Sequence, residues 1–147
     1  MTLDRWDISP YVGVGPLRFG MLRPEVRSLL GRGISVFKKG PYATTETDAC
    51  DELGLHLHYD TEDQLECIEA FGSCPIHYNG VSLLNASTNN VLERLGRLGL
   101  CSRYDDGYFF DDGGFALASD EIVKAVTVYR KGYYDETPES GSNDIGS

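Results

Sequence analysis

Residues 17–32 read LRFGMLRPEVRSLLGR and residues 82–97 read SLLNASTNNVLERLGR, so the chain repeats one pattern 65 positions apart. The matched positions pair Val26 with Val91, Leu30 with Leu95 and Gly31 with Gly96. In both copies the apolar residues recur at helical spacing after a short strand-like run. The pattern predicts two short helices, each of which follows a short strand.

A second echo follows each of these segments. Residues 54–57 (GLHL) match residues 114–117 (GFAL), and residues 65–71 match residues 123–129. We therefore expect an α+β fold of two tandem repeats, each with a helix and antiparallel strands, which share a core and pack their helices on one face of the sheet. Repeats of this kind build extended binding surfaces more often than catalytic clefts.

The chain has 147 residues, which suits one domain, because halves of about 70 residues would each be marginal alone. We expect a single domain over residues 1–135, made of repeats at about 16–72 and 81–130. The apolar pattern disappears after Tyr134. Residues 136–147 are therefore predicted to be a disordered tail.

Apolar and polar residues alternate most clearly over residues 53–59, which predicts a strand with His56 and His58 on its polar face. Residues 60–64 have the composition of a hairpin turn that leads back into the next strand. By contrast, residues 1–15 are predicted to be an irregular lead, and residues 40–52 a polar loop. In the second repeat, strands are expected over residues 101–104, 108–110, 115–118 and 123–129.

The formal net charge is −10 and the isoelectric point is near 4.6. Nucleic acid and anionic membranes would be repelled by this charge, so neither is expected as a partner. A basic protein would be attracted instead. We also expect a cytoplasmic location, since the first residues, MTLDRWD, carry no basic stretch before an apolar run.

The Gly20-Met21 turn, the short helix with Glu25-Val26 and the closing Leu29-Leu30-Gly31 form a pattern found in known families. It resembles the helix entry of the BamE (SmpA/OmlA) outer-membrane lipoproteins and of the tandem-repeat β-lactamase inhibitor proteins. It also resembles small bacterial immunity-type proteins, which neutralise a cognate toxin. The resemblance implies helices packed on one face of an antiparallel sheet, and a function in binding other proteins rather than in catalysis.

The chain departs from these families at two places. Asn85-Ala86 replaces the Gly-Met turn in the second copy. At the first helix, Leu22 stands where the families carry Ser or Thr, and a leucine side chain cannot accept a hydrogen bond from the helix N-terminus. One backbone donor is therefore expected to find another partner.

Residues 104–113, YDDGYFFDDG, form the most unusual local sequence. One interpretation is a pair of hairpin turns in which Asp tolerates left-handed geometry; a calcium site is disfavoured, because the ligand spacing of a calcium loop is absent. Another is a recognition surface, since aromatic rings supply contact area and carboxylates attract a basic partner. The candidate partner-binding residues are Tyr104, Asp105, Asp106, Tyr108, Phe109, Asp111, Asp112, Tyr59, Asp60, Tyr133 and Tyr134.

Candidates for chemistry are few. His56 and His58 form a His-x-His pair that could hold a metal ion with a third ligand such as His77, but alternate positions on a strand also suit polar side chains that bind nothing. The four cysteines form no Cys-x-x-Cys pair, and reduced thiols are expected, with a disulfide in an exported form as the alternative. No catalytic metal or cofactor is predicted.

These observations favour a stoichiometric protein-binding inhibitor that is not an enzyme. The hypothesis is an immunity protein that blocks the basic active site of a cognate bacterial toxin. Two alternatives stay open: a small metal-dependent enzyme or metal-binding domain that uses His56 and His58, and a scaffold subunit that inhibits nothing. The location of the interface depends on how the two repeats pack. If they form one continuous sheet, the face that carries His56 and His58 is the candidate interface. If they pack back to back, the loops are.

Overall fold

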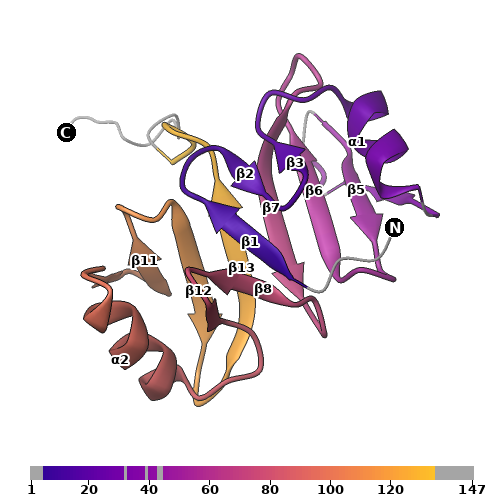
Figure 1. The fold of residues 1–147 in the computed structure, drawn as a ribbon. Helices are drawn as coiled ribbons and strands as arrows, with labels where there is room; N and C mark the ends of the chain where they lie inside the picture. The colour runs from indigo at the N-terminus through magenta and orange to yellow at the C-terminus, as the bar shows by residue number, and fades with distance from the viewer. Residues whose placement is uncertain (1–4, 32, 39, 43–44, 135–147) are drawn as a thin grey trace.

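The computed structural model describes residues 5–31, 33–38, 40–42 and 45–134, and within them the chain forms a strand-rich α+β fold with two helices and two sheets (Figure 1). The predicted tail at residues 136–147 lies outside the described residues. After β1 (Trp6–Ser9), the first half contains β2 (Gly13–Val14), β3 (Leu17–Arg18), α1 (Arg23–Leu30), β4 (Ser35–Phe37), β5 (Thr47–Cys50), β6 (Leu55–Tyr59) and β7 (Leu65–Phe71).

The second half follows the same order of elements. It contains β8 (Ile76–Tyr78), β9 (Val81–Ser82), α2 (Thr88–Arg97), β10 (Arg103–Tyr104), β11 (Tyr108–Phe110), β12 (Phe115–Ser119) and β13 (Val123–Tyr129). Each half thus runs from a short hairpin through a helix to four antiparallel strands.

The larger sheet joins the two halves through their last strands. Its order is β10-β11-β12-β13-β7-β6-β5-β4, and all of its pairings are antiparallel. In the central pairing Glu69 lies opposite Thr127, and each is the fifth residue of its strand. An approximate two-fold axis therefore passes between these two residues, with four strands on either side.

The turn before each helix is held to the last strand of its half by matching hydrogen bonds. In the first half, the Gly20 amide donates to the Leu65 carbonyl oxygen at 2.9 Å; in the second, the Asn85 amide donates to the Val123 carbonyl oxygen at 2.9 Å. Gly20 has φ of 94° and Asn85 has φ of 63°. Asn can replace Gly here because it tolerates left-handed geometry better than most residues.

The two helices solve their N-terminal hydrogen bonding differently. The Leu22 amide donates to a Glu25 carboxylate oxygen at 2.9 Å, and the Arg23 amide donates to the Asp63 carbonyl oxygen at 3.1 Å. The backbone amides of Leu22 and Arg23 thus find partners in the Glu25 side chain and in the neighbouring hairpin. In α2 the Ser87 hydroxyl accepts from the Asn90 amide at 3.4 Å.

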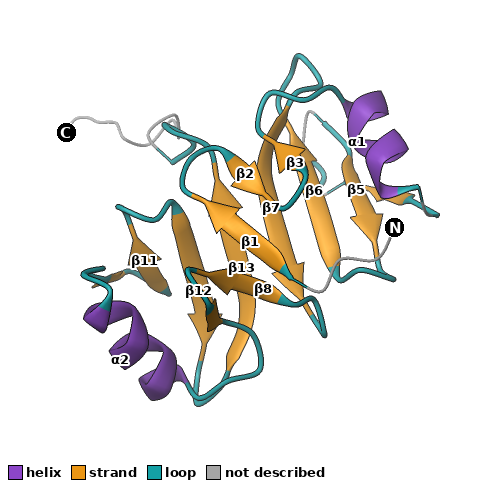
Figure 2. Ribbon diagram, in the orientation of Figure 1, coloured by secondary structure: helices purple, strands orange, loops and turns teal. Residues whose placement is uncertain are grey.

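The smaller sheet has the order β3-β2-β1-β8-β9, in which β1 and β8 are parallel. Together with α1 and α2 it lies over one face of the larger sheet (Figure 2). One core fills the space between these layers, because Trp6, Val26 and Leu95 belong to the same buried cluster as the residues of β6, β7, β12 and β13.

Two sequence predictions were wrong. Residues 1–15 contain β1 and β2 rather than an irregular lead, and residues 40–52 contain the buried strand β5 rather than only a loop. Short strands with few alternating residues give too weak a periodicity to be recognised. The two helix ends also differ from each other: Gly31 ends α1 in the left-handed conformation, whereas its counterpart Gly96 lies inside α2, which continues to Arg97.

The described helices have eight and ten residues, and neither is long and apolar enough to cross a membrane.

We expect a fragment that ends at Gly80 to lack cooperative folding, because it would lose β13 and with it the strand that pairs with all of β7 except its start. Thermal melting followed by circular dichroism tests this, with the full chain as the control. A sharp melting transition of the fragment would show that the halves do not depend on a shared sheet.

Candidate functional site

The candidate site is the second face of the eight-stranded sheet, which we call the open face. Within the described residues, no helix or second sheet packs against it (Figure 2). Side chains alternate along strands, so the cross-strand registers show which residues share this face. They are Ser35, Phe37, Thr47, Ala49, His56, His58, Cys67, Glu69, Phe71, Arg103, Phe109, Ala116, Ala118, Ala125, Thr127 and Tyr129.

Glu69 lies at the centre of the open face. One of its carboxylate oxygens is 3.7 Å from His56 Nδ1 and 3.6 Å from His58 Nε2. The side chain of Glu69 is 36% exposed, that of His56 27% and that of His58 only 7%. The expectation that both histidines line a solvated polar face is therefore correct only for His56, because His58 is buried beside Thr47.

His58 lies between Thr47 and Glu69. A hydroxyl, a histidine and a carboxylate in this sequence of contacts resemble the catalytic triad of hydrolases. Its Nδ1 atom is 3.1 Å from the Thr47 hydroxyl oxygen. However, Thr47 is only 2% exposed, so no substrate can approach that hydroxyl. The third candidate ligand, His77, lies in the smaller sheet with its Nδ1 atom 2.9 Å from the Pro75 carbonyl oxygen, and no group of three metal-ligating side chains occurs among the described residues.

An aromatic cluster covers one end of the open face. The Tyr134 ring lies 4.8 Å from the Tyr129 ring, 5.0 Å from the Tyr133 ring and 5.3 Å from the Phe109 ring. Burial raises the pKa of Tyr134 to about 12 and raises that of Tyr133 further, so both phenols stay protonated at neutral pH. Tyr133 and Tyr134, predicted to bind a partner, thus lie beside the open face.

The acidic and aromatic segment at residues 104–113 forms the edge of the same sheet. Tyr104 is 68% exposed, and Asp105, Asp106 and Asp112 are exposed as well. The Asp111 carboxylate is paired with Arg103 at 2.7 Å, and the Arg103 guanidinium lies over the Phe109 ring at 4.6 Å. Tyr108 and Phe109 point to opposite faces, so only Phe109 reaches the open face.

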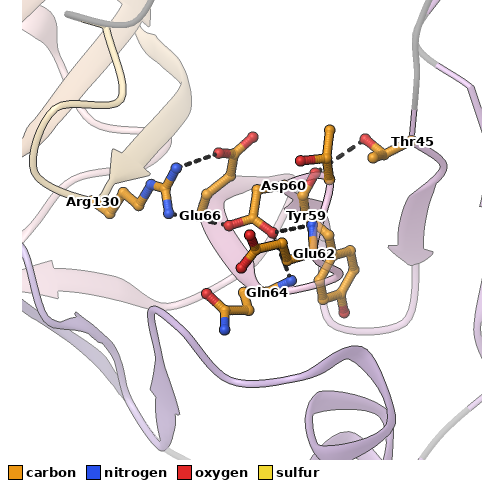
Figure 3. Close-up of a pocket in the computed structure, with 8 residues that line it drawn as sticks. Thr45, Tyr59, Asp60, Glu62, Gln64, Glu66 and Arg130 are labelled. Atoms are coloured by element: carbon orange, nitrogen blue, oxygen red, sulfur yellow. Dashed lines mark hydrogen bonds and ion pairs between the residues drawn. The ribbon is translucent and has the colours of Figure 1, made fainter.

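Figure 3 shows a polar pocket of about 440 Å³ beside the hairpin between β6 and β7. Arg130 lines it, and its guanidinium pairs with Asp60 Oδ2 and Glu66 Oε1, each at 3.2 Å. The other oxygen of Asp60 accepts the amides of Glu62 and Gln64, each at 2.9 Å. Asp60, a predicted partner-binding residue, is therefore engaged in holding its own hairpin to the end of β13.

Tyr59 is the one predicted partner-binding residue that the structure places in the interior, at 1% exposure. Its hydroxyl donates to an Asp48 carboxylate oxygen at 3.1 Å, and the Arg23 guanidinium lies over its ring at 4.1 Å. Tyr59 is therefore not available to contact a partner.

Asp48 is the centre of a buried ionic cluster that sequence analysis missed. Its fully buried carboxylate accepts from Arg23 at 2.9 Å and from Arg27 at 2.7 Å, and both arginines belong to α1. Burial alone would raise the pKa of this carboxyl, but the hydrogen bonds from Arg27 and Tyr59 and the charges of both arginines hold the pKa below its usual value. The only sequence signal was the i, i+4 spacing of the two arginines.

The four cysteines form no disulfide in the structure. Cys50, Cys67, Cys74 and Cys101 are all free, and three of them are buried. Burial raises the pKa of the Cys74 thiol to about 12, so it is not a nucleophile at neutral pH.

Comparison of this chain with protein-family models, curated proteins and solved structures finds no match. The function must therefore be argued from the geometry of the open face.

We expect Asp48→Asn to lower the free energy of unfolding by about 3–5 kcal/mol, because the two arginines would lose a buried counter-charge. Denaturant unfolding at pH 7 measures this. Asp7→Asn is the matched control, since that carboxylate is 53% exposed and its loss should cost about 0.5 kcal/mol or less.

The same pair of variants gives a pH test. Because folding lowers the pKa of Asp48, its carboxylate stabilises the fold above the unfolded pKa of about 4, and this contribution is lost as the pH falls through the folded-state pKa. The stability gap between wild type and Asp48→Asn should narrow in acid. A gap that stays constant down to pH 2 would contradict this role.

Proposed function

We propose that this chain is a stoichiometric protein-binding inhibitor, an immunity-type protein that neutralises a cognate bacterial toxin. The observation that carries the proposal is the single continuous sheet, one face of which is left uncovered by both helices and the smaller sheet. The proposal includes the finer description of the fold as a tandem repeat of the kind seen in the inhibitor and lipoprotein families named above.

The open face has the composition of a protein interface. The rings of Phe37 and Phe71 flank His56 at 5.0 Å and 4.6 Å, and Phe37 is 38% exposed. Across the central pairing, the side chains of Ala125 and Thr127 are short and extend little above the sheet. Phe37 and Phe71 can therefore supply aromatic contact area to a partner, and the short side chains beside them leave room for side chains of that partner.

Charge supports a basic partner. The net charge is −10, and the exposed carboxylates of Asp105, Asp106 and Asp112 lie at the β10–β11 and β11–β12 turns of the same sheet. Long-range attraction would speed the approach of a basic protein, while the aromatic residues would hold it. A toxin that acts on nucleic acid has such a basic active site, because it must bind phosphates.

The first test uses the protein encoded by the gene immediately upstream, since a toxin and its inhibitor must be made together. We expect co-purification with the full chain and loss of the toxin's activity in the complex. A stable complex that leaves the activity unchanged would support the scaffold alternative, and absence of any complex would remove the support for inhibition.

In such a complex we expect the double variant Phe37→Ala/Phe71→Ala to weaken binding about tenfold or more, because buried aromatic residues dominate interface energetics. Calorimetry measures the dissociation constant. Leu29→Ala is the control, because Leu29 is 49% exposed on α1 and lies away from the open face. Equal effects of the control and the double variant would place the interface elsewhere.

Charge reversal at Asp105, Asp106 and Asp112 should slow association several-fold in low salt and have a smaller effect at high salt, since surface charges act mainly on encounter. Asp111 is left unchanged because it pairs with Arg103. Stopped-flow kinetics provide the measurement; an association rate that does not respond to the reversal would exclude this edge from partner recognition.

A further inference from the structure

We propose that Glu69 and its neighbours on the open face form a receptor for one arginine side chain of the partner. This inference rests on the proposed function and adds to it the chemistry of the contact at the centre of the sheet. Glu69 forms an ion pair with the guanidinium, and the surrounding side chains pack against the plane of that group.

The position of Glu69 favours such a contact. It lies on the central strand β7 beside the approximate two-fold axis, so a partner that covers the open face must cover Glu69. Its side chain is 36% exposed. It is also the only carboxylate whose register places it on the open face in the described strands, because Asp48 faces the helices and Glu66 lies at the register shift beside Arg130.

The side chains on the two sides of Glu69 differ in size. On β6 it faces the His56 ring, which contacts the rings of Phe37 and Phe71. On β13 it faces Thr127, and the next residue across is Ala116. Aromatic rings thus lie near His56 on one side of Glu69, and smaller side chains lie on the other. Ala116 is only 7% exposed, so a flat group would lie over the half-buried Thr127, with its edge towards the carboxylate.

Arginine fits this shape better than lysine. Its planar guanidinium donates several hydrogen bonds in one plane and stacks against aromatic rings, whereas an ammonium group is compact and strongly hydrated. In this arrangement the guanidinium donates to Glu69, and the Thr127 hydroxyl offers a second acceptor. His56 and His58 are the other titratable groups against Glu69, and Tyr134 acts on the same carboxylate.

The test is a nuclear magnetic resonance titration of the full chain with N-acetyl-L-arginine amide. The titration is run at pH 8. N-acetyl-L-citrulline amide, which has the same shape without the charge, is the control ligand. The readout is the methyl signals of Thr127, Ala116 and Ala125 on the open face.

We expect saturable shifts of these methyl signals with a dissociation constant of about 1–10 mM, as suits a single charged and stacked side chain. Citrulline amide should bind about fivefold more weakly or worse, and Glu69→Gln should show the same loss with the arginine probe. Glu93→Gln, at an exposed carboxylate on α2, should bind the probe as wild type does.

Equal shifts with the two ligands, or shifts that do not saturate, would overturn the receptor even if Glu69→Gln fails to fold. Failure of the arginine contact and failure of the proposed function give different results. If a toxin is captured through Phe37 and Phe71 while Glu69→Gln has no effect on its affinity, the open face is the interface and the arginine contact is wrong. If the arginine probe binds and no toxin is captured, the receptor stands without the inhibitor function.

Discussion

The pairing of β7 with β13 is the interaction on which the rest of the structure depends. Five consecutive residue pairs join these strands, and through them two four-stranded halves become one sheet. The small hairpins of both halves then meet in the second sheet, where β1 bridges them by pairing with β8. Both helices and this second sheet lie on one side of the larger sheet, and in the described part of the chain no helix or sheet packs against its other side.

The two halves stabilise their helices by different means. The Asp48 cluster joins α1 to β5 and β6 through charge, and it fixes the helix by directional hydrogen bonds. At the positions in α2 that correspond to Arg23 and Arg27 stand Thr88 and Leu92, and the Thr88 hydroxyl donates to the Asp120 carbonyl oxygen at 2.8 Å. Burying an ion pair costs desolvation free energy, but its hydrogen bonds specify geometry. In the first half they fix the position of α1, which is shorter than α2.

Sequence periodicity was sufficient to predict both helices, the strands β6, β7, β12 and β13, and a shared core, because these elements bury regular apolar faces such as that of Val26 and Leu30. It could not reveal β1, β2 or β5, which are short, or the smaller sheet, which depends on a parallel pairing between residues 70 positions apart. The site was predictable only in part. His56 was expected on an accessible face, but the neighbouring Glu69 and the burial of Tyr59 follow from register and packing, which no local pattern encodes.

We propose that the partner binds to the open face. The most direct test is methyl nuclear magnetic resonance of the complex with the protein encoded upstream, which compares signals from the two sides of the molecule. We expect the methyl groups of Ala116, Ala118, Ala125 and Thr127 to shift or broaden strongly while those of Leu29 on α1 stay unchanged. Shifts confined to Leu29 and the helices, with the four open-face methyl signals unaltered, would contradict the account.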